Sequence, residues 1–456
     1  MKLKGKKVLV VGLGLQGGGL ATVRWLLHQR ARVSVTDLKN RRQLESSLKN
    51  LGHLPIKFVL GQHPLSLLRG VDLVVQNPAV PNSLPLIRRA ERLGIPIEGE
   101  ASIFLKMCPA PVIAVTGSKG KSTVASWLGF MFKNAGYHTM VAGNIRDRLM
   151  LSILPNINPN TKVVLELSSW QLENLGRFKL SPPLAVITNI LPDHLDRYKN
   201  MSQYAQAKAN IWRWQSKSDK AVLNWDNIIT RKLGRLAQSK IFWFSTQAKV
   251  SAGCYIYKKS VWFKSGQSQI KLFSVKDVAL AGAHNLANAL AAATTAVVAG
   301  VPPPQIRRAV LKFIGLHSRQ QLVREVGGVK YINDTTATMP DATQKALDTF
   351  KKYPITLIAG GYDKKLSYAG LARDIRRRVQ NLILLPGSAT KNILAKLPKK
   401  YPYIIVKTMA QAIVSARRLT ARGGVVLMSP AAASFGLFIN EWDRGEQFVK
   451  AVRKLK

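Results

Sequence analysis

A short glycine-rich segment near residue 120 carries the residues best suited to bind phosphate. The sequence TGSKGKST at 116–123 follows an apolar run at 112–116 and precedes a helical pattern at 124–133. Backbone N–H groups of such a turn surround phosphate oxygens, and the helix N-terminus adds positive potential. Lys121 can reach the β- and γ-phosphates, and Ser122 or Thr123 can hold Mg²⁺.

The segment is a shortened form of the general phosphate loop, because Val115 stands where the general pattern has a further glycine. A simple turn between a strand and a helix is the alternative. The predicted nucleotide-phosphate site comprises Gly117, Ser118, Lys119, Gly120, Lys121, Ser122 and Thr123.

Acidic residues follow two later apolar runs, where they could hold a metal ion. Glu166 closes one run, and Asp193-His194-Leu195-Asp196 follows the next. A carboxylate at the end of a strand beside a phosphate loop is well placed to bind Mg²⁺, although a solvated strand end would look the same. His194 lies between two acids, which favours an active-site role over a structural one. Lys208, from its helical spacing alone, is predicted to be an ordinary surface lysine.

A second glycine loop lies near the N-terminus. Gly12-Leu13-Gly14-Leu15-Gln16-Gly17 matches the GxGxxG pattern, follows an apolar run and opens a helical segment. Asp37 ends the next predicted strand, 20 residues after Gly17, where a dinucleotide site places its ribose-binding acid. A dehydrogenase and a site for another pyrophosphate are the alternatives. No later segment resembles a hydride-transfer site, so two phosphate loops favour two phosphorylated ligands.

Polar residues at one helix start and three strand ends complete the candidate sites. Asn285 and Asn288 open an alanine-rich helix, and side chains at i and i+3 share one face; they either grip a nucleotide or cap the helix. Small, hydroxyl and basic residues at 333–338, 360–364 and 429–435 follow predicted strands, where open α/β sheets bind ligands. A lysine and two hydroxyls there could bind a carboxylate, whereas each segment alone could be a turn.

The elements that must position these residues alternate between strand and helix. The strands that we predict lie at residues 7–11, 32–36, 72–75, 112–116, 163–167, 184–188, 330–332, 355–359, 382–385, 403–406 and 425–428, with short strands at 241–274. A proline-rich joint at 108–111 separates the first unit from the second. We predict an α/β fold of three domains: Rossmann-like at 1–108, P-loop ATPase-like with a small β extension at 109–314, and Rossmann-like at 315–456.

Charge and cysteine content limit the classes of function. The 456 residues include 69 Lys and Arg against 23 Asp and Glu, a net charge of +46. No arginine-rich tail or basic–aromatic repeat accompanies this charge, which favours polyanionic substrates or a general compositional bias over dedicated nucleic-acid binding. No apolar stretch reaches the roughly 18 residues of a membrane span, and the N-terminal run is too short for a signal peptide. Two distant cysteines indicate a reducing cytoplasm.

The ordered set of motifs resembles the Mur ligases over essentially the whole chain. The segments that carry the resemblance are TGSKGKST, ELSSWQLE, DHLDRY followed by YAQAK, GAHNLAN, INDTTAT, GGYDK and SPAAASFGLFINEWDRGEQF. Any one motif is weakly specific, but their common order and spacing are strongly so. NDTTAT, the last segment and the first glycine loop resemble the member of the family that adds D-glutamate.

The resemblance implies an ATP-dependent ligase of peptidoglycan precursor synthesis. Such an enzyme adds D-glutamate to UDP-N-acetylmuramoyl-L-alanine through an acyl phosphate, with ATP and two Mg²⁺ ions. The resemblance also implies a cytoplasmic monomer that needs neither a membrane nor a specific nucleic acid. A Mur-type ligase for a different amino acid and a dinucleotide-dependent reductase are the alternatives.

Residue roles follow from the resemblance by matching position. The implied catalytic residues are Lys121, Glu166, His194 and Lys208. The implied Mg²⁺ ligands are Ser122, Glu166, His194 and Lys208, with Lys208 carboxylated on its side-chain nitrogen. The implied nucleotide contacts beyond the phosphate loop are Asn285, Asn288, Arg319 and Asp334. The implied contacts of the UDP-linked substrate are Gly14, Leu15, Gln16, Asp37, Lys39, Asn77 and Asn144, and those of D-glutamate are Thr338, Lys364, Ser434 and Phe435.

Overall fold

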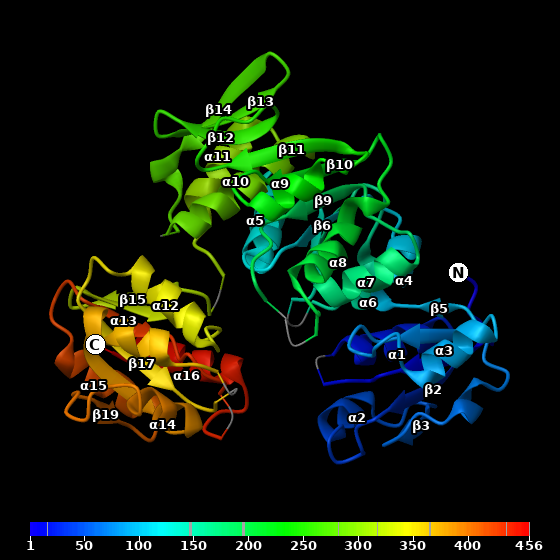
Figure 1. Cartoon of the computed structure of the whole chain (residues 1–456), viewed down its shortest axis with the longest axis horizontal. Helices are drawn as coiled ribbons and strands as arrows, with labels where there is room; N and C mark the ends of the chain where they lie inside the picture. Colours follow the sequence, from blue (N-terminus) through cyan, green and yellow to red (C-terminus); the bar gives the residue numbers. More distant parts are fainter. Residues whose placement is uncertain are drawn as a thin grey trace. The chain divides into compact units, whose positions relative to one another are not determined.

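The computed structural model describes the whole chain except residues 16, 146, 147, 194–196, 281, 317, 364, 365, 435 and 456. The chain divides into two compact units (Figure 1). The first comprises Met1–Ala279 and Ala283–Phe313, and the second comprises Leu280–Gly282 and Ile314–Lys456. The first unit contains two separate sheets and the second contains one. The domain boundaries predicted at 108 and 314 stay predictions.

The first sheet is parallel and has the strand order β3-β2-β1-β4-β5. Its strands are β1 (Lys7–Val11), β2 (Arg32–Asp37), β3 (Lys57–Leu60), β4 (Leu73–Gln76) and β5 (Ile97–Glu98), with helices α1 (Gly18–His28), α2 (Glu45–Leu51) and α3 (Pro85–Arg92). The apolar sequence KVLVV makes β1 a buried central strand. Because β2 and β4 lie on opposite sides of β1, the first glycine loop follows the strand at which the order reverses, a usual ligand position.

The second sheet has nine strands in the order β14-β13-β12-β11-β10-β9-β6-β8-β7. They are β6 (Val112–Thr116), β7 (Thr139–Gly143), β8 (Lys162–Glu166), β9 (Leu184–Ile187), β10 (Lys220–Asn224), β11 (Lys240–Ser245), β12 (Gly253–Tyr257), β13 (Ser260–Ser265) and β14 (Ser268–Ser274). The strands from β7 to β12 are parallel, and β12 to β14 form an antiparallel ribbon. The predicted β extension is therefore continuous with the main sheet.

Helices surround this second sheet and link it to the first. They are α4 (Glu100–Met107), α5 (Lys121–Asn134), α6 (Met150–Ile153), α7 (Ser169–Arg177), α8 (Met201–Arg213), α9 (Ile228–Gly234), α10 (Ala283–Val298) and α11 (Pro303–Lys312). One apolar cluster runs from Val10 of the first sheet through Phe104 of α4 to Leu165 of the second. The two sheets of the first unit thus share a core.

The sheet of the second unit has the order β15-β16-β20-β17-β18-β19. Its elements are β15 (Gln321–Val326), β16 (Val329–Asn333), α12 (Pro340–Thr349), β17 (Ile355–Gly360), α13 (Ala369–Arg378), β18 (Val379–Leu385), α14 (Ser388–Leu394), β19 (Ile404–Ile405), α15 (Met409–Leu419), β20 (Val425–Met428) and α16 (Glu441–Arg453). Only β15 is antiparallel, and the sequence did not predict it, because its alternating polar residues lie on an exposed edge. Separate apolar clusters cover the two faces.

The predicted α/β fold with Rossmann-like terminal parts and a central phosphate-loop sheet is confirmed. In the part of the chain that the structure describes, no helix is both long enough and apolar enough to cross a bilayer.

Candidate active site

The phosphate loop joins β6 to α5 and requires glycine at two positions. Gly117 has φ 151° and Gly120 has φ 86°, values that residues with a Cβ rarely adopt. A Cβ on Gly117 would lie 1.9 Å from the hydroxyl oxygen of Thr188, and one on Gly120 would lie 2.3 Å from the amide oxygen of Asn288. The loop is packed too closely for side chains, as expected where backbone N–H groups must approach a ligand.

The loop is fastened to the segment that follows β9. Ser118 donates its hydroxyl hydrogen to the carbonyl oxygen of Leu191 at 3.0 Å and accepts from the Leu191 N–H at 2.9 Å. The Lys119 N–H donates to the Asn189 side chain at 2.9 Å, and the Lys119 ammonium pairs with Asp193 at 3.1 Å. The loop and the end of β9 therefore form one scaffold.

Lys121 begins α5, and its side chain folds back over the loop. Its Nζ donates to the carbonyl oxygens of Gly117 at 2.9 Å and Ser118 at 3.1 Å. Ser122 and Thr123 follow, half-buried, in the first turn of the helix. A positive charge thus lies at the loop, where it would be close to phosphate oxygens bound by the helix N-terminus.

Glu166 ends β8, which pairs with β6. The residue is only 2% exposed, which excludes the alternative of a solvated strand end. Its Oε1 lies 3.4 Å from the amide nitrogen of Asn144, and its Oε2 has no hydrogen-bond partner among the residues that the structure describes. A buried carboxylate oxygen without a partner is costly. A hard cation such as Mg²⁺ would satisfy it, so the residues present fit that ion.

Lys208 is buried on α8, so the surface position predicted from helical spacing alone is wrong. The residue is 2% exposed, and its Nζ donates to the Gly117 carbonyl oxygen at 3.0 Å. Burial, and secondarily the nearby charge of Lys121, lower the pKa of Lys208 to about 6. Its amine is therefore mostly uncharged at neutral pH. The helical pattern alone could not reveal that this face packs against the phosphate loop.

Asn285 and Asn288 lie near the start of α10 and are both buried. The Asn288 amide donates to the Asn285 side-chain oxygen at 3.4 Å. Since the Asn288 oxygen also lies against Gly120, the structure brings this pair to the phosphate loop. Their contact with a nucleotide stays a prediction.

Asp37, at the end of β2, organises the first glycine loop. Its Oδ2 accepts the N–H groups of Leu13 at 2.9 Å and Gly14 at 3.0 Å, and its Oδ1 accepts the N–H of Lys39 at 2.9 Å. Both carboxylate oxygens thus hold the backbone of the loop. The pattern of a dinucleotide site did not predict this supporting role, and a contact with a ligand stays a prediction.

Asn77 follows β4 and lies beside the same loop. A Cβ on Gly12 would lie 2.9 Å from the Asn77 Cβ, which explains the need for glycine there. Leu15 is exposed at the tip of the loop. The structure therefore brings together most of the residues predicted to contact the UDP-linked substrate in the first sheet.

The three predicted strand ends of the second unit meet at one edge of its sheet. The Ala431 N–H donates to the Ala337 carbonyl oxygen at 2.9 Å. Tyr362 and Ala433 exchange two backbone hydrogen bonds of 2.9 and 3.0 Å. These hydrogen bonds join the segments after β16, β17 and β20 to one another. The sequence could suggest this proximity only through the rule that the carboxyl ends of parallel strands share one edge of a sheet.

Asp334 follows β16 and is buried. Its carboxylate accepts from the Ser429 hydroxyl at 2.8 Å and from the Gln320 N–H at 3.2 Å. Burial raises the pKa of Asp334 to about 7, against the lowering effect of these hydrogen bonds and of Arg319. Arg319 itself is exposed.

Arg444 on α16 is a residue to which sequence reasoning assigned no role. It is fully buried, and its guanidinium donates to the Thr335 hydroxyl at 3.0 Å, the Thr335 carbonyl at 2.9 Å and the Ala432 carbonyl at 3.1 Å. The guanidinium joins two of the three strand-end segments. The sequence contains 69 lysines and arginines, and no motif distinguishes Arg444 from the others.

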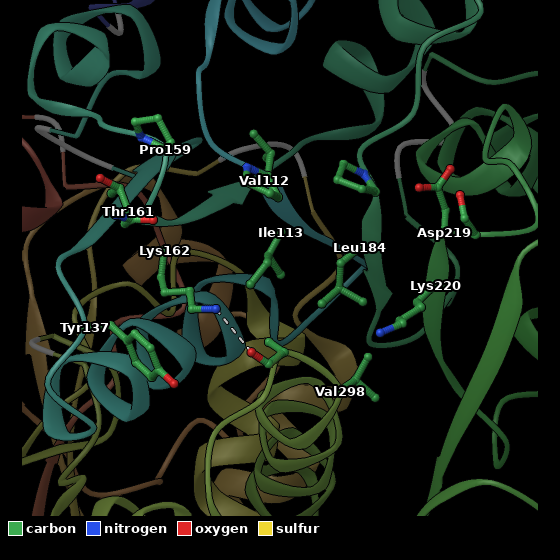
Figure 2. A pocket seen from close by; sticks show the side chains of 15 residues that line it. Val112, Ile113, Tyr137, Pro159, Thr161, Lys162, Leu184, Asp219, Lys220 and Val298 are labelled. Carbon is green, nitrogen blue, oxygen red and sulfur yellow. Dashed lines mark hydrogen bonds between the residues drawn. The ribbon is translucent and has the colours of Figure 1, made fainter.

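Figure 2 shows a separate cavity of about 600 Å³ at the opposite edge of the second sheet. It is lined by the starts of β6, β8, β9 and β10 and by the end of α10. The Lys162 ammonium donates there to the Ala299 carbonyl oxygen at 3.2 Å and lies 4.8 Å from the centre of the Tyr137 ring. The phosphate loop and Glu166 lie at the carboxyl ends of the same strands, so this cavity is not part of the candidate active site.

Three family models match the chain in order. They are described as Mur ligase MurD-like, N-terminal domain, at residues 6–99; Mur ligase middle domain, at 115–296; and Mur ligase, glutamate ligase domain, at 318–432. A relative from Roseiflexus sp. (strain RS-1), named UDP-N-acetylmuramoylalanine–D-glutamate ligase, is 43% identical over 464 residues that cover 99% of each chain. The chain belongs to the Mur ligase family.

Other relatives and solved structures agree with this membership. A protein of the same name from Koribacter versatilis (strain Ellin345) is 38% identical over 100% of this chain and 99% of its own. The crystal structure of a UDP-N-acetylmuramate–alanine ligase from Thermotoga maritima has a TM-score of 0.60 at 21% identity, over 99% of this chain and 100% of that one. The MurF ligase from the same organism in complex with ADP has a TM-score of 0.58 at 17% identity, over 99% and 96%. At these identities the two structures support the Mur ligase fold alone.

The structure brings one set of predicted residues of this Mur ligase together around the phosphate loop: Lys121, Ser122, Asn144, Glu166, Lys208, Asn285 and Asn288. Four predicted site residues, Gln16, His194, Lys364 and Phe435, lie outside the described residues. Among the described residues no group of three His, Cys, Asp or Glu side chains is arranged to hold a metal ion. Sequence reasoning missed Asn189 and Tyr204, whose side chains contact the phosphate loop, because neither lies in a pattern specific for phosphate binding.

Proposed function

We propose that this Mur ligase joins D-glutamate to UDP-N-acetylmuramoyl-L-alanine at the expense of ATP, as a step of peptidoglycan precursor synthesis. The observation that carries the proposal is the 43% identity, over 99% of each chain, to a relative named for that reaction. The geometry supports it with a phosphate loop beside a buried carboxylate and with a second glycine loop in the first sheet. Two such loops suit a reaction that has two phosphorylated reactants.

The proposed chemistry activates the alanyl carboxylate. One of its oxygens attacks the γ-phosphorus of ATP, so that an acyl phosphate forms and ADP leaves. The amine of D-glutamate then attacks the acyl carbon, and inorganic phosphate departs from the tetrahedral intermediate as the amine loses a proton. Because the substrate supplies the nucleophile, no covalent bond to the enzyme is required. Lys121 offsets the negative charge of the reacting phosphates.

Mg²⁺ bound beside the phosphate loop would neutralise phosphate charge and align the reacting oxygens. We propose Ser122, Glu166, His194 and carboxylated Lys208 as the residues that hold it, at two sites. The unpartnered Oε2 of Glu166 supports this proposal, because it is a buried anionic oxygen with nothing else among the described residues to bind.

The environment of Lys208 supports the proposed carboxylation. An uncharged amine can attack carbon dioxide and release a proton, which leaves a carboxylate on the nitrogen. The lowered pKa of about 6 makes the uncharged form abundant at pH 7. The resulting anion would lie close to Lys121 and supply a further oxygen ligand for Mg²⁺.

The other substrate contacts are proposed from the matching positions. For the UDP-linked acid they are Gly14, Leu15, Gln16, Asp37, Lys39, Asn77 and Asn144; for D-glutamate they are Thr338, Lys364, Ser434 and Phe435; for the nucleotide they are the phosphate loop with Asn285, Asn288, Arg319 and Asp334. From the same resemblance we propose a monomer that works in the cytoplasm without a nucleic-acid or membrane partner.

The proposal is tested by incubating the purified chain with UDP-N-acetylmuramoyl-L-alanine, ATP, Mg²⁺ and a panel of amino acids. We expect ADP and the amide product with D-glutamate alone. Lys121→Ala should reduce the rate by at least a hundredfold, because one fixed charge on the phosphates is lost. Product formation with L-lysine or L-alanine instead would indicate another Mur-type ligase, and ADP release independent of the amine would contradict amide formation. A reductase would instead change NAD(P)H fluorescence.

A further inference from the structure

The UDP-linked substrate of the proposed reaction must be held by two different sheets at once. Its diphosphate is proposed to bind the glycine loop after β1, while its acid must reach Glu166 and the phosphate loop after β6. Asn144, which follows β7, lies beside Glu166: its N–H donates to the Glu166 carbonyl oxygen at 2.8 Å. Something must therefore fix the segment around Asn144 relative to the first glycine loop.

The segment that begins at Asn144 ends at α6. The Gly143 N–H, just before Asn144, donates to the Arg148 carbonyl oxygen at 2.9 Å, which brings Arg148 next to the end of β7. Leu149 occupies the cap position of α6 and provides no side-chain hydrogen bond to the helix. The first N–H groups of α6, at Met150 and Leu151, have no partner within the helix itself.

Glu100 supplies the partner for these N–H groups. It is the first residue of α4, is almost fully buried, and accepts hydrogen bonds from the N–H groups of Met150 and Leu151. Its Oε2 also lies against α1, because a Cβ on Gly18 would lie 3.3 Å from that oxygen. The two helices α4 and α1 both pack against α6.

A second contact joins the same two segments. A Cβ on Gly17, the last glycine of the first loop, would lie 3.2 Å from a side-chain carbon of Leu149. The end of the glycine loop therefore lies next to Leu149 at the start of α6, and the Glu100 carboxylate accepts from the next two residues of that helix. The carboxylate is positioned to control the distance between the two proposed parts of the substrate site, the first glycine loop and the segment around Asn144.

A buried carboxyl group at this position is expensive for stability. Burial raises the pKa of Glu100 to about 7, and no cation is among the groups that offset the burial. Glu98, two residues earlier, is equally buried but pairs with Ser102 at 2.6 Å and with Lys106, all within its own segment. An apolar residue in place of Glu100 would avoid this cost but would leave the two N–H groups at the start of α6 without an acceptor, so the carboxylate joins α4 to α6.

We propose that Glu100 is a positioning residue for the UDP-linked substrate: it fixes the Asn144 segment against the first glycine loop, so that one ligand can reach both. This inference rests on the proposed function. Glu100 does not touch the substrate; it acts through the backbone of α6 and through Gly18.

The test compares Glu100→Gln with the matched control Glu98→Gln. The amide in Glu100→Gln keeps the size of the side chain but turns an NH₂ toward one of the two N–H donors, so one hydrogen bond is lost. We expect its KM for UDP-N-acetylmuramoyl-L-alanine to rise at least tenfold, with the KM for ATP unchanged within twofold. Glu98→Gln should leave both values within twofold, and Glu100→Asp should lie between the wild type and Glu100→Gln.

Direct binding separates positioning from a merely structural role. Calorimetric titration should show the same loss of affinity for the UDP-linked acid in Glu100→Gln and no change for ATP, while both variants remain folded by circular dichroism. Unchanged affinity for the UDP-linked acid in an active, folded Glu100→Gln protein would overturn the inference, as would an equal loss for ATP. A wild-type protein that makes no product with any amino acid would instead overturn the proposed function. If Glu100→Gln does not fold, Gly18→Ala replaces it, because the added methyl group crowds the same carboxylate oxygen. Gly18→Ala must then raise the KM for the UDP-linked acid and not that for ATP. A Gly18→Ala protein without this selective rise overturns the inference.

Discussion

The side-chain nitrogen of Lys208 lies 3.0 Å from the carbonyl oxygen of Gly117, so a buried amine is bound to the backbone of the phosphate loop. The same carbonyl oxygen also accepts from Lys121, at 2.9 Å. Two amines with one acceptor between them repel each other when both are charged, which is the second cause of the low pKa of Lys208. The loop thus holds a largely uncharged amine beside the lysine that is proposed to bind phosphate.

The uncharged state of Lys208 leads to a prediction about covalent chemistry. When the protein is incubated with ¹³C-labelled bicarbonate near pH 8, a carbamate carbon resonance should appear in its ¹³C NMR spectrum. Lys208→Gln should lack the resonance, because the buried amine with the lowered pKa is removed. Lys162→Gln, which alters a lysine at the opposite edge of the sheet, serves as the control and should retain it. An unchanged resonance in Lys208→Gln would assign the carbamate to another amine.

Glu166→Gln should separate metal binding from stability. Loss of the buried charge should weaken Mg²⁺ binding at least tenfold, because a hard cation prefers an anionic oxygen. Without Mg²⁺, the variant should be as stable as the wild type or more stable by about 1 kcal/mol, since an unpartnered buried charge is removed. Denaturant unfolding with and without Mg²⁺ measures both effects. A destabilisation of several kcal/mol without the metal would show that the carboxylate has an unrecognised structural partner.

Gly117→Ala should damage the phosphate loop far more than a glycine substitution nearby. The added carbon would lie 1.9 Å from the Thr188 hydroxyl oxygen, whereas one on Gly136, also in a left-handed conformation, would meet nothing within 4 Å. We expect Gly136→Ala to cost about 1 kcal/mol of backbone strain and to leave ATP affinity intact. Gly117→Ala should cost about 2–4 kcal/mol and weaken ATP binding strongly. Fluorescence titration with a labelled nucleotide gives the comparison, and equal affinities would contradict the loop geometry.

The buried carboxyl of Asp334 predicts a pH dependence for the second unit. Its pKa rises from 3.8 to about 7 on burial, so the folded state binds more protons than the unfolded state between these values. The free energy of unfolding should therefore be highest near pH 4 and decline as the pH rises to 7, by roughly 4 kcal/mol at most. Asp334→Asn should flatten this decline. Hydrogen exchange of the β16 and β20 amides, measured from pH 5 to 8, reports on this unit, and parallel curves for both proteins would exclude Asp334 as the cause.

The features that could be predicted from the sequence are those that depend on local residue patterns. The two glycine loops, the apolar strands before them and the polar strand ends were all recognisable, because each requires particular residue types at fixed spacing. Strand β15 was missed because its residues alternate at an exposed edge, and β7 was missed because TMVAG is short and ends in glycine.

What could not be predicted depends on contacts between distant segments. Lys208 was predicted to lie on the surface and Arg444 was assigned no role, yet each is buried and bound to a loop that lies about a hundred residues away. Asp37 was recognised as an acid at the correct strand end, but its hydrogen bonds to the loop backbone became visible only in the structure. Four predicted site residues lie outside the described residues, and the ligand contacts of the others stay predictions.

The attachment of the phosphate loop to the end of β9 has a thermodynamic consequence. Ser118 and Lys119 are bound to Leu191 and Asn189, in the same stretch that leads to the proposed metal ligand His194. Nucleotide and cation would then reinforce one another through a shared piece of backbone, and by linkage each must raise the affinity of the other by the same factor. Asn189 is remote from the reacting atoms of both ligands. Asn189→Ala should therefore reduce the mutual enhancement of nucleotide and cation binding more than it reduces the affinity for either ligand bound alone.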